Sequence, residues 1–237
     1  MGTRFKAVVL LSGGLDSATT LYVAKTSGWD CFALTFDYGQ RHRREIRAAR
    51  AVARRAGVPF QAIKIQFPWK GSALLDRREV LPKGRPLEEI GRGIPATYVP
   101  ARNTIFLAFA LSYAEAIGGR RIYIGANALD SSGYPDCRPD YYHAFQGVAR
   151  KGTKAGVEGF GIDILTPLIN KTKADIVRLG QELHVPFDLT WSCYEGGRVP
   201  CLKCDACLLR AKGFQEADMR DPGIPRPRGR PRSVLSS

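Results

Sequence analysis

The stretch SGGLDS at residues 12–17 limits the fold more than any other part of the sequence. It follows KAVVLL at residues 6–11, a short apolar run that predicts a strand, and it leads into residues 18–27, which predict a helix. Glycines let backbone N–H groups approach an anion closely, and a helix start adds unpaired N–H donors and a positive dipole end. This strand–loop–helix unit therefore predicts an anion-binding loop, with a plain turn capped by Asp16 or Ser17 as the alternative.

Neither common phosphate-loop pattern describes these residues. No lysine follows the glycines, so the loop is not G-x-x-x-x-G-K-[ST], and it does not match G-x-G-x-x-G either. Asp16 is unexpected beside a phosphate because two negative charges repel each other. Its presence is explained if it binds Mg²⁺ or supports the backbone turn, since carboxylate oxygens are common Mg²⁺ ligands.

Short apolar runs alternate with helical patterns after this loop. Further strands are predicted at residues 31–36, 60–66, 121–126 and 163–167. Further helices are predicted at residues 45–56, 104–117, 141–150, 172–183 and 208–217. Thr172 and Asp175 have the spacing of a capping box at the start of one of these helices. Strands that alternate with helices indicate a parallel sheet with crossover helices, so we predict an α/β fold.

Four cysteines near the end of the chain form a second strong pattern. Cys193, Cys201, Cys204 and Cys207 follow the spacing C-x₇-C-x₂-C-x₂-C. Four thiolates on tight turns complete the closed tetrahedral shell of a structural zinc ion, so we predict a small zinc-binding helical lobe over residues 188–220. An iron–sulfur cluster is the alternative, but the cysteine followed by proline that is usual in such runs is absent.

Charge and composition narrow the functional classes. The net charge of +14 favours an anionic ligand, but four arginines lie in the Pro- and Arg-rich segment at residues 221–237, which we expect to be disordered. Seven arginines between residues 41 and 55 indicate a solvated helix face, with phosphate or RNA contact as the alternative. Residues 68–97 carry Pro, Gly and mixed charge and predict an irregular insertion. Without an apolar run of about 18 residues or a cleavage site, we expect a cytoplasmic chain with no membrane span.

The full string SGGLDS resembles the S-G-G-x-D-S loop of the ATP pyrophosphatase, or PP-loop, superfamily. The resemblance implies a Rossmann-like (HUP-like), doubly wound parallel sheet over residues 1–187. It also implies cleavage of ATP to AMP and pyrophosphate, with transfer of the adenylyl group to an acceptor oxygen. The implied ATP-binding residues are Leu11, Ser12, Gly13, Gly14, Leu15, Asp16, Ser17, Ala18, Thr19 and Phe36. Asp16, Ser17 and Lys173 would act in catalysis, although Lys173 could equally be a solvated residue in the first turn of its helix.

Three further motifs support a narrower resemblance. FDYGQRHR at residues 36–43, VPARN at 99–103 and GYPDCR at 133–138, with the cysteine cluster, resemble the family of 7-cyano-7-deazaguanine synthases over about residues 6–210. The resemblance implies a C–N bond-forming ligase of queuosine biosynthesis that uses ATP, Mg²⁺ and ammonium. It would convert 7-carboxy-7-deazaguanine into the nitrile through adenylated acid and amide intermediates. We expect small-molecule substrates, a homodimer and no nucleic-acid partner.

The same motifs carry the implied substrate contacts. These residues are Tyr38, Gln40, Arg41, Arg102, Asn103, Asp130, Tyr134, Asp136 and Arg138. Arg41 or Arg102 would pair with the substrate carboxylate, and Asp130 or Asp136 would accept from the guanine-like N–H groups. Tyr134 would stack on the ring. Structural roles are the alternatives, such as a turn cap for Asp136 or a helix N-terminal surface position for Arg102.

Two other functions are compatible with the sequence. A tRNA thiolase or lysidine synthetase of the same superfamily would suit the positive charge, although no tRNA-binding domain is recognisable. A zinc-bearing nucleic-acid-binding module with a vestigial ATP loop is the other, and the intact Ser12, Asp16 and Ser17 argue against it. Cys137 could be a nucleophile, but neighbouring carboxylates should raise its pKa, which favours a buried and inert thiol.

Overall fold

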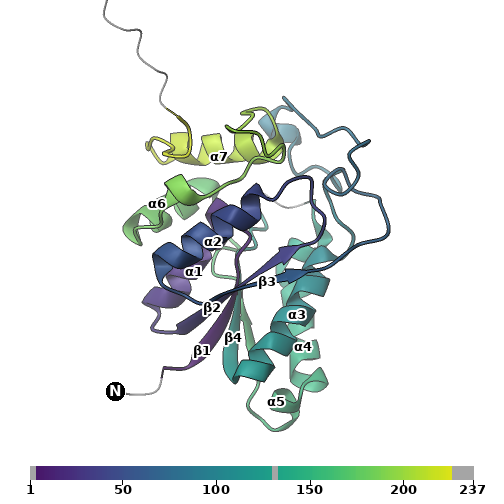
Figure 1. The fold of residues 1–237 in the computed structure, drawn as a ribbon, viewed down its shortest axis with the longest axis vertical. Helices are drawn as coiled ribbons and strands as arrows, with labels where there is room; N and C mark the ends of the chain where they lie inside the picture. The colour runs from purple at the N-terminus through teal and green to yellow at the C-terminus, as the bar shows by residue number, and fades with distance from the viewer. Residues whose placement is uncertain (1–3, 130–132, 226–237) are drawn as a thin grey trace, which may run out of the picture.

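The computed structural model describes residues 4–129 and 133–225. Its centre is a five-stranded sheet in the order β3-β2-β1-β4-β5, and every strand pair is parallel (Figure 1). The strands are β1 (Lys6–Leu10), β2 (Asp30–Asp37), β3 (Phe60–Lys64), β4 (Gly119–Ile124) and β5 (Asp163–Leu165). The predicted parallel sheet is confirmed. The last three strands end two residues earlier than predicted.

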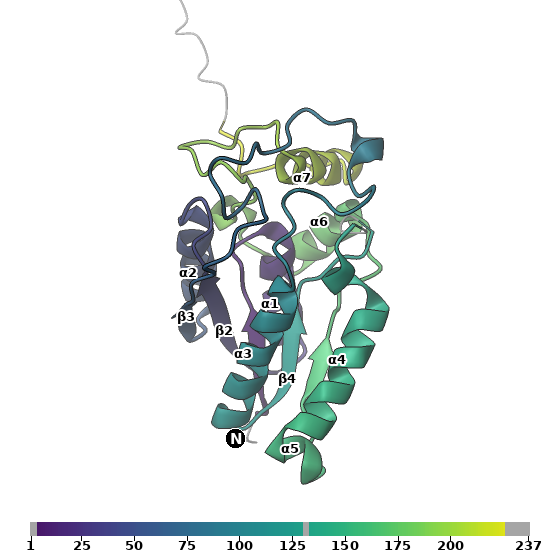
Figure 2. The ribbon, with the colours of Figure 1, turned by 90° about the vertical axis from the view of Figure 1, so that its right-hand side faces the viewer.

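Helices cover both faces of this sheet, as expected for a doubly wound fold (Figures 1 and 2). One face carries α1 (Leu15–Thr26) and α2 (Arg44–Ala56), with α6 (Lys173–Glu182) and α7 (Asp205–Glu216) beyond them. The other face carries α3 (Arg102–Ile117) and α4 (Pro139–Gly152), followed by the short α5 (Lys154–Val157). The α6 capping box is confirmed, since the Asp175 N–H donates to Thr172 Oγ1 at 3.1 Å and the Asp175 side chain accepts from the Thr172 N–H.

The central strand shows why the sequence supports two cores. Ala7 and Val9 of β1 pack in the core beneath α1 and α2, whereas Val8 and Leu10 pack in the core beneath α3. Successive side chains of a strand point to opposite faces, so a continuous apolar run is required where both faces are covered. β1 is therefore fixed in the middle of the sheet.

The strand order reverses between β1 and β4. In open parallel sheets such a reversal leaves a crevice beyond the carboxyl ends of the strands, where ligands bind. The loop after β1 and the segments after β2 and β4 all meet at this edge. Figure 1 shows the insertion and α7 lying over the same edge.

The irregular insertion is confirmed, since its only helical piece is a short 3₁₀ turn, Leu87–Glu89 (η1), among the described residues. It docks on the C-terminal lobe. The Gly84 N–H donates to the Lys203 carbonyl at 2.8 Å, and Arg85 Nε donates to Asp205 Oδ1 at 3.2 Å. Two segments far apart in the sequence thus form one cover over the carboxyl edge.

Ordered contacts continue past the predicted lobe boundary at residue 220. Asp221 is buried and forms a bidentate ion pair with Arg210 of α7, with Nε–Oδ2 at 2.7 Å and Nη2–Oδ1 at 2.9 Å. Residues 226–237 of the expected tail lie outside the described residues. The division into residues 1–187 and 188–220 stays a prediction. No helix in the described part of the chain is long and apolar enough to cross a membrane.

Candidate functional site

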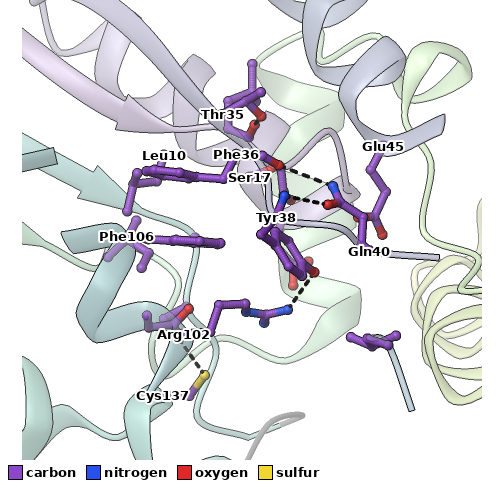
Figure 3. A pocket seen from close by; sticks show the side chains of 18 of the residues that line it. Leu10, Ser17, Thr35, Phe36, Tyr38, Gln40, Glu45, Arg102, Phe106 and Cys137 are labelled. Carbon is purple, nitrogen blue, oxygen red and sulfur yellow. Dashed lines mark hydrogen bonds between the residues drawn. The ribbon is translucent and has the colours of Figure 1, made fainter. Parts of the chain in front are cut away.

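A cavity opens at the carboxyl edge of the sheet, where the strand order reverses (Figure 3). Its walls come from the ends of β1, β2 and β4, from the first turns of α1, α2 and α3, and from the insertion and the C-terminal lobe. The lining side chains used below are Leu11, Ser12, Asp16, Ser17, Phe36, Tyr38, Gln40, Arg41, Glu45, Arg102, Asn103, Phe106, Tyr134, Cys137 and Tyr194. Four separate sequence motifs, SGGLDS, FDYGQRHR, VPARN and GYPDCR, are therefore brought to one cavity.

The SGGLDS loop is folded tightly around its own side chains. Gly13 has φ +90°, and a Cβ there would lie 2.2 Å from the Glu45 carbonyl oxygen, so only glycine fits. The Gly13 N–H donates to Ser17 Oγ at 3.2 Å, and the Ser12 and Ser17 hydroxyl oxygens are 3.0 Å apart. The Gly14 N–H donates to Ser12 Oγ at 3.3 Å. The loop is thus held in shape before any ligand binds.

A lysine from a distant helix joins this loop. Lys173 Nζ, at the start of α6, lies 2.9 and 2.8 Å from Asp16 Oδ1 and Oδ2. The ion pair is mostly buried, with side-chain exposures of 11% and 26%. This contact places an ammonium group beside the anion-binding loop, and it requires Gly213 of α7, whose Cβ would lie 2.3 Å from Lys173 Cγ. The predicted roles of Asp16 with Mg²⁺ and of Lys173 with phosphate stay predictions.

The implied ATP-binding residues other than Gly13 and Gly14 separate into two groups. Leu11, Ser12, Asp16, Ser17 and Phe36 line the cavity. The side chains of Leu15, Ala18 and Thr19 are instead fully buried under the loop, because they face the core beneath α1. Only their backbone could reach a ligand.

An aromatic pair forms the flat wall beside the loop. The rings of Phe36 and Phe106 stack with centroids 4.0 Å apart and an interplanar angle of 5°. Tyr38 packs against Phe106 at 5.5 Å. These rings offer apolar faces to a planar ligand, and the expected contact of Phe36 with adenine remains a prediction.

The two arginines predicted to bind a carboxylate have different surroundings. Arg41 donates to the backbone carbonyls of Ala73, Asp76 and Glu79, so its guanidinium holds the insertion in place. Arg102, at the first residue of α3, donates to Tyr38 Oη at 3.2 Å and faces the cavity (Figure 3). The geometry favours Arg102 over Arg41 for an anionic ligand.

Several predicted substrate contacts serve the protein itself. Gln40 supports its own turn, because Oε1 accepts from the Tyr38 N–H at 2.9 Å and Nε2 donates to the Phe36 carbonyl at 3.2 Å. Asp136 is buried, and its Oδ2 accepts from the Asn103 N–H at 3.0 Å, which caps the start of α3.

The remaining predicted substrate contacts differ in their access to the cavity. Asn103 donates back to the Asp136 carbonyl at 3.0 Å, so its amide is engaged within the protein. Tyr134 lines the cavity, and its hydroxyl lies 2.7 Å from Thr97 Oγ1. Arg138 is exposed and does not line the cavity, and Asp130 lies outside the described residues.

Cys137 has the properties of a structural thiol. It is buried, and Asn103 Nδ2 donates to its sulfur at 3.4 Å. Burial, together with the Asp136 carboxylate, raises the pKa of Cys137 to about 12. The thiol is therefore protonated near neutral pH. The expected burial of Cys137 is confirmed, and its lack of reactivity stays a prediction.

Several cavity residues are absent from the sequence-based set, among them Phe106, Glu45 and Tyr194. Glu45 lies in the first turn of α2, and burial raises its pKa to about 7, although Arg102 opposes that shift. Its only signal is that it is the one acidic residue in an arginine-rich helix. Tyr194 directly follows a metal-site cysteine, and it hydrogen-bonds to Tyr134 in the cavity. No spacing pattern identifies it.

The four cysteines form one cluster. The sulfur atoms of Cys193, Cys201, Cys204 and Cys207 all lie within 4.8 Å of one another. The backbone N–H groups of Cys201 and Glu195 donate to Cys193 Sγ at 3.3 and 3.4 Å, and such bonds favour a thiolate. Four convergent sulfurs with N–H donors suit a tetrahedral metal ion, so the predicted cluster can hold a metal.

Known proteins resemble this chain over nearly its whole length. A family model described as queuosine biosynthesis protein QueC matches residues 6–218. The chain is 58% identical over 219 residues to a 7-cyano-7-deazaguanine synthase from Nostoc sp., covering 92% of this chain and 96% of the relative. It is 52% identical over 220 residues to a protein of the same name from Thermoplasma acidophilum, covering 92% and 91%. A solved NMN synthetase from Francisella tularensis has a TM-score of 0.48 and 20% identity, covering 84% and 71%.

Proposed function

The chain belongs to the QueC family of queuosine biosynthesis proteins, and we propose that it is an ATP-dependent 7-cyano-7-deazaguanine synthase. The observation that carries the proposal is the cavity. It joins an S-G-G-x-D-S loop at one end to Tyr38 and Arg102 at the other, at the strand reversal where parallel sheets bind ligands. The named relatives are 52–58% identical over 92% or more of this chain.

The proposed reaction uses one site twice. A carboxylate oxygen of 7-carboxy-7-deazaguanine attacks the α-phosphorus of ATP, and pyrophosphate leaves. Ammonia then attacks the acyl carbon and releases AMP, which gives the amide and one proton. The amide oxygen attacks the α-phosphorus of a second ATP, pyrophosphate leaves, and loss of AMP and two protons leaves the nitrile. Each adenylation places an oxygen in line with the α-phosphorus of the ATP bound at that step, so one ATP-binding site serves both steps.

The loop end of the cavity suits the nucleotide. The Ser12 and Ser17 hydroxyls and the Lys173 ammonium would bind the pyrophosphate portion, which develops negative charge as it leaves. Asp16 is the residue that would hold Mg²⁺ at this end. Bound Mg²⁺ would offset the charge of the phosphate oxygens. Phe36 and Phe106 would supply the apolar wall for the adenine.

The opposite end suits the acceptor. Arg102 would bind the substrate through the donors of its guanidinium that Tyr38 does not use. Zinc in the four-cysteine cluster would fix the segment that carries Tyr194, so its role would be structural because four protein ligands leave no open position. The proposal includes a cytoplasmic homodimer that acts on small molecules and belongs to the C–N bond-forming ligases.

A direct assay tests this function. The protein is incubated with ATP, Mg²⁺, ammonium and 7-carboxy-7-deazaguanine, and products are identified by mass spectrometry. The expected product is the nitrile, with about two AMP formed per nitrile by the scheme above. No nitrile should form when ammonium is omitted. AMP formation with tRNA but not with the deazaguanine would contradict the proposal and favour a tRNA-modifying enzyme.

A further inference from the structure

The first turn of α2 carries a carboxyl group for which the described residues provide no hydrogen-bonding or ionic partner. Glu45 lines the cavity and is partly buried. Among residues 4–129 and 133–225, its carboxylate makes no hydrogen bond and no ion pair. Figure 3 shows its side chain directed toward the space beside Gln40 and the Tyr38 hydroxyl. A buried acceptor without a donor is unfavourable, so the site is incomplete without a ligand.

The other polar groups at this end of the cavity differ from Glu45. The amides of Gln40 and Asn103 are engaged with the backbone, and Asp136 accepts from the start of α3. Asp16 is paired with Lys173 at the far end. Among these side chains of the described residues, Glu45 is therefore the one whose hydrogen-bond acceptors remain available to a ligand.

Charged and titratable groups surround Glu45 on several sides. Arg102 faces it from α3, and the hydroxyls of Tyr38 and Tyr194 are close enough to feel its charge. Cys193 of the metal cluster acts on it from the lobe. Across the cavity the guanidinium of Arg102 offers donors, whereas Glu45 offers acceptors. A complementary ligand has N–H donors on one edge and acceptor atoms elsewhere.

The walls of the cavity add a shape requirement. Tyr38 supplies an aromatic ring at the acceptor end of the cavity, where it packs against Phe106. Flat aromatic faces favour a planar ring system. A planar heterocycle whose edge carries two adjacent N–H donors satisfies both the walls and the carboxylate, which can accept two parallel hydrogen bonds. A guanine-like ring has this edge in its N1–H and its 2-amino group.

We propose that Glu45 binds the N1–H and 2-amino edge of the deazaguanine and thereby selects a ring that carries the 2-amino group. The inference rests on the proposed function, because it specifies how that substrate is held. Glu45 takes the role that the sequence assigned to Asp130 or Asp136. Asp136 is excluded from that role by its bond to the start of α3.

The test compares two substrates and two enzymes. Wild type and Glu45→Gln are assayed with 7-carboxy-7-deazaguanine and with its 2-desamino analogue, 7-carboxy-7-deazahypoxanthine. For wild type we expect kcat/KM to be about 10- to 100-fold higher with the 2-amino substrate, since a site built to accept from an N–H group rejects a ring that lacks it. In Glu45→Gln the preference should fall to about threefold or less, because the amide NH₂ opposes a ring donor.

Matched controls separate recognition from folding. Glu79→Gln changes an exposed carboxyl in the insertion and should keep the wild-type preference. Bound metal, circular dichroism and ATP affinity of Glu45→Gln should equal those of wild type. If the Gln variant loses metal or ATP affinity, Glu45→Asp serves in its place, since it keeps the acceptor on a shorter side chain and should retain the preference with a higher KM.

The outcomes distinguish this inference from the function on which it rests. Nitrile formation with an unchanged preference in Glu45→Gln would overturn the inference alone. Equal losses on both substrates would also overturn it, because they would place Glu45 in a step that does not involve the 2-amino group. Absence of nitrile from wild type with either substrate would overturn the proposed function, and this inference with it.

Discussion

The two ends of the cavity are built in different ways. At the nucleotide end, Ser12, Ser17 and Asp16 come from six consecutive residues, and they bond to one another and to Lys173. At the acceptor end, Tyr38, Glu45, Arg102, Tyr134 and Tyr194 come from five separate segments. There the guanidinium of Arg102 and the carboxyl of Glu45 both face the cavity. Among the described residues, Arg102 donates to Tyr38 Oη and the Glu45 carboxyl has no hydrogen-bond or ion-pair partner.

This difference indicates a division of work. An end whose polar groups already bond to one another keeps its shape without ligand, and such preorganised groups stabilise charge without reorganising. An end with incompletely paired charged groups gains its missing hydrogen bonds only when the correct ligand binds, and this makes it selective. The nucleotide end would therefore control rate, and the acceptor end would control which substrate enters.

Loss of the metal site should have the largest effect, because the lobe touches both ends. The Trp191 N–H donates to the Gly13 carbonyl at 2.9 Å, and Tyr194 lines the acceptor end. Cys204→Ser removes one of the four ligands and should abolish turnover together with ATP affinity. Metal analysis and calorimetry with ATP would measure both. Cys31 is a buried thiol outside the cluster, so the control variant Cys31→Ala should still bind the metal. Full activity of the metal-free Cys204→Ser protein would show that the two ends of the cavity do not depend on the lobe.

The next largest effect should fall on the nucleotide end alone. Asp16→Asn keeps the size of the side chain but removes its charge, and turnover should fall about 100- to 1,000-fold, the range seen when a charge-stabilising group is lost. Binding of 7-carboxy-7-deazaguanine, measured by calorimetry, should change less than about threefold, since the acceptor end is separate. Asp163→Asn on the exposed start of β5 is the control. An equal loss of substrate affinity would refute the division between the two ends.

A moderate effect on stability should come from the acceptor end. The pKa of Glu45 is about 7 in the folded protein and 4.5 as its ordinary value, so folding favours the neutral form. The contribution of this group to the free energy of unfolding is therefore fully present below pH 4.5. It is lost as the pH rises towards 7, and the protein stays less stable above pH 7. Glu45→Gln should raise the free energy of unfolding by about 1–3 kcal/mol at pH 8, with a smaller gain at pH 5.5. Urea unfolding at both pH values would show this, and a gain that does not vary with pH would contradict it.

The smallest effect is expected from Cys137, which lines the cavity but is expected to take no part in the reaction. Cys137→Ala should change kcat and KM by less than about threefold, because a thiol with a pKa of about 12 supplies no nucleophile near neutral pH. Its stability should fall by about 1 kcal/mol, as is usual for trimming a buried side chain. A large loss of kcat with normal stability would instead assign Cys137 to catalysis.

The sequence predicted those features whose chemistry lies in one short stretch. The loop at residues 12–17 and the four cysteines are each readable because spacing alone brings their groups together. The strands and helices were predicted within a few residues, since periodicity reports which side chains are buried. The roles of individual polar residues were less predictable. Arg41 bonds to carbonyls more than 30 residues away, and Asp136 bonds to Asn103 across 33 positions.

The sequence by itself therefore determined the fold class, the anion-binding loop and the metal-site cysteines, because local order is enough to specify them. The tertiary structure decided which candidate side chains reach a ligand. In that structure Asp136 is buried, and Arg41 donates to carbonyls of the insertion. Asp16 is paired with Lys173, whereas Glu45 faces the cavity. The physical reason is that a polar side chain bonds to whatever donors or acceptors the packing of distant segments brings near, and no local pattern encodes that packing.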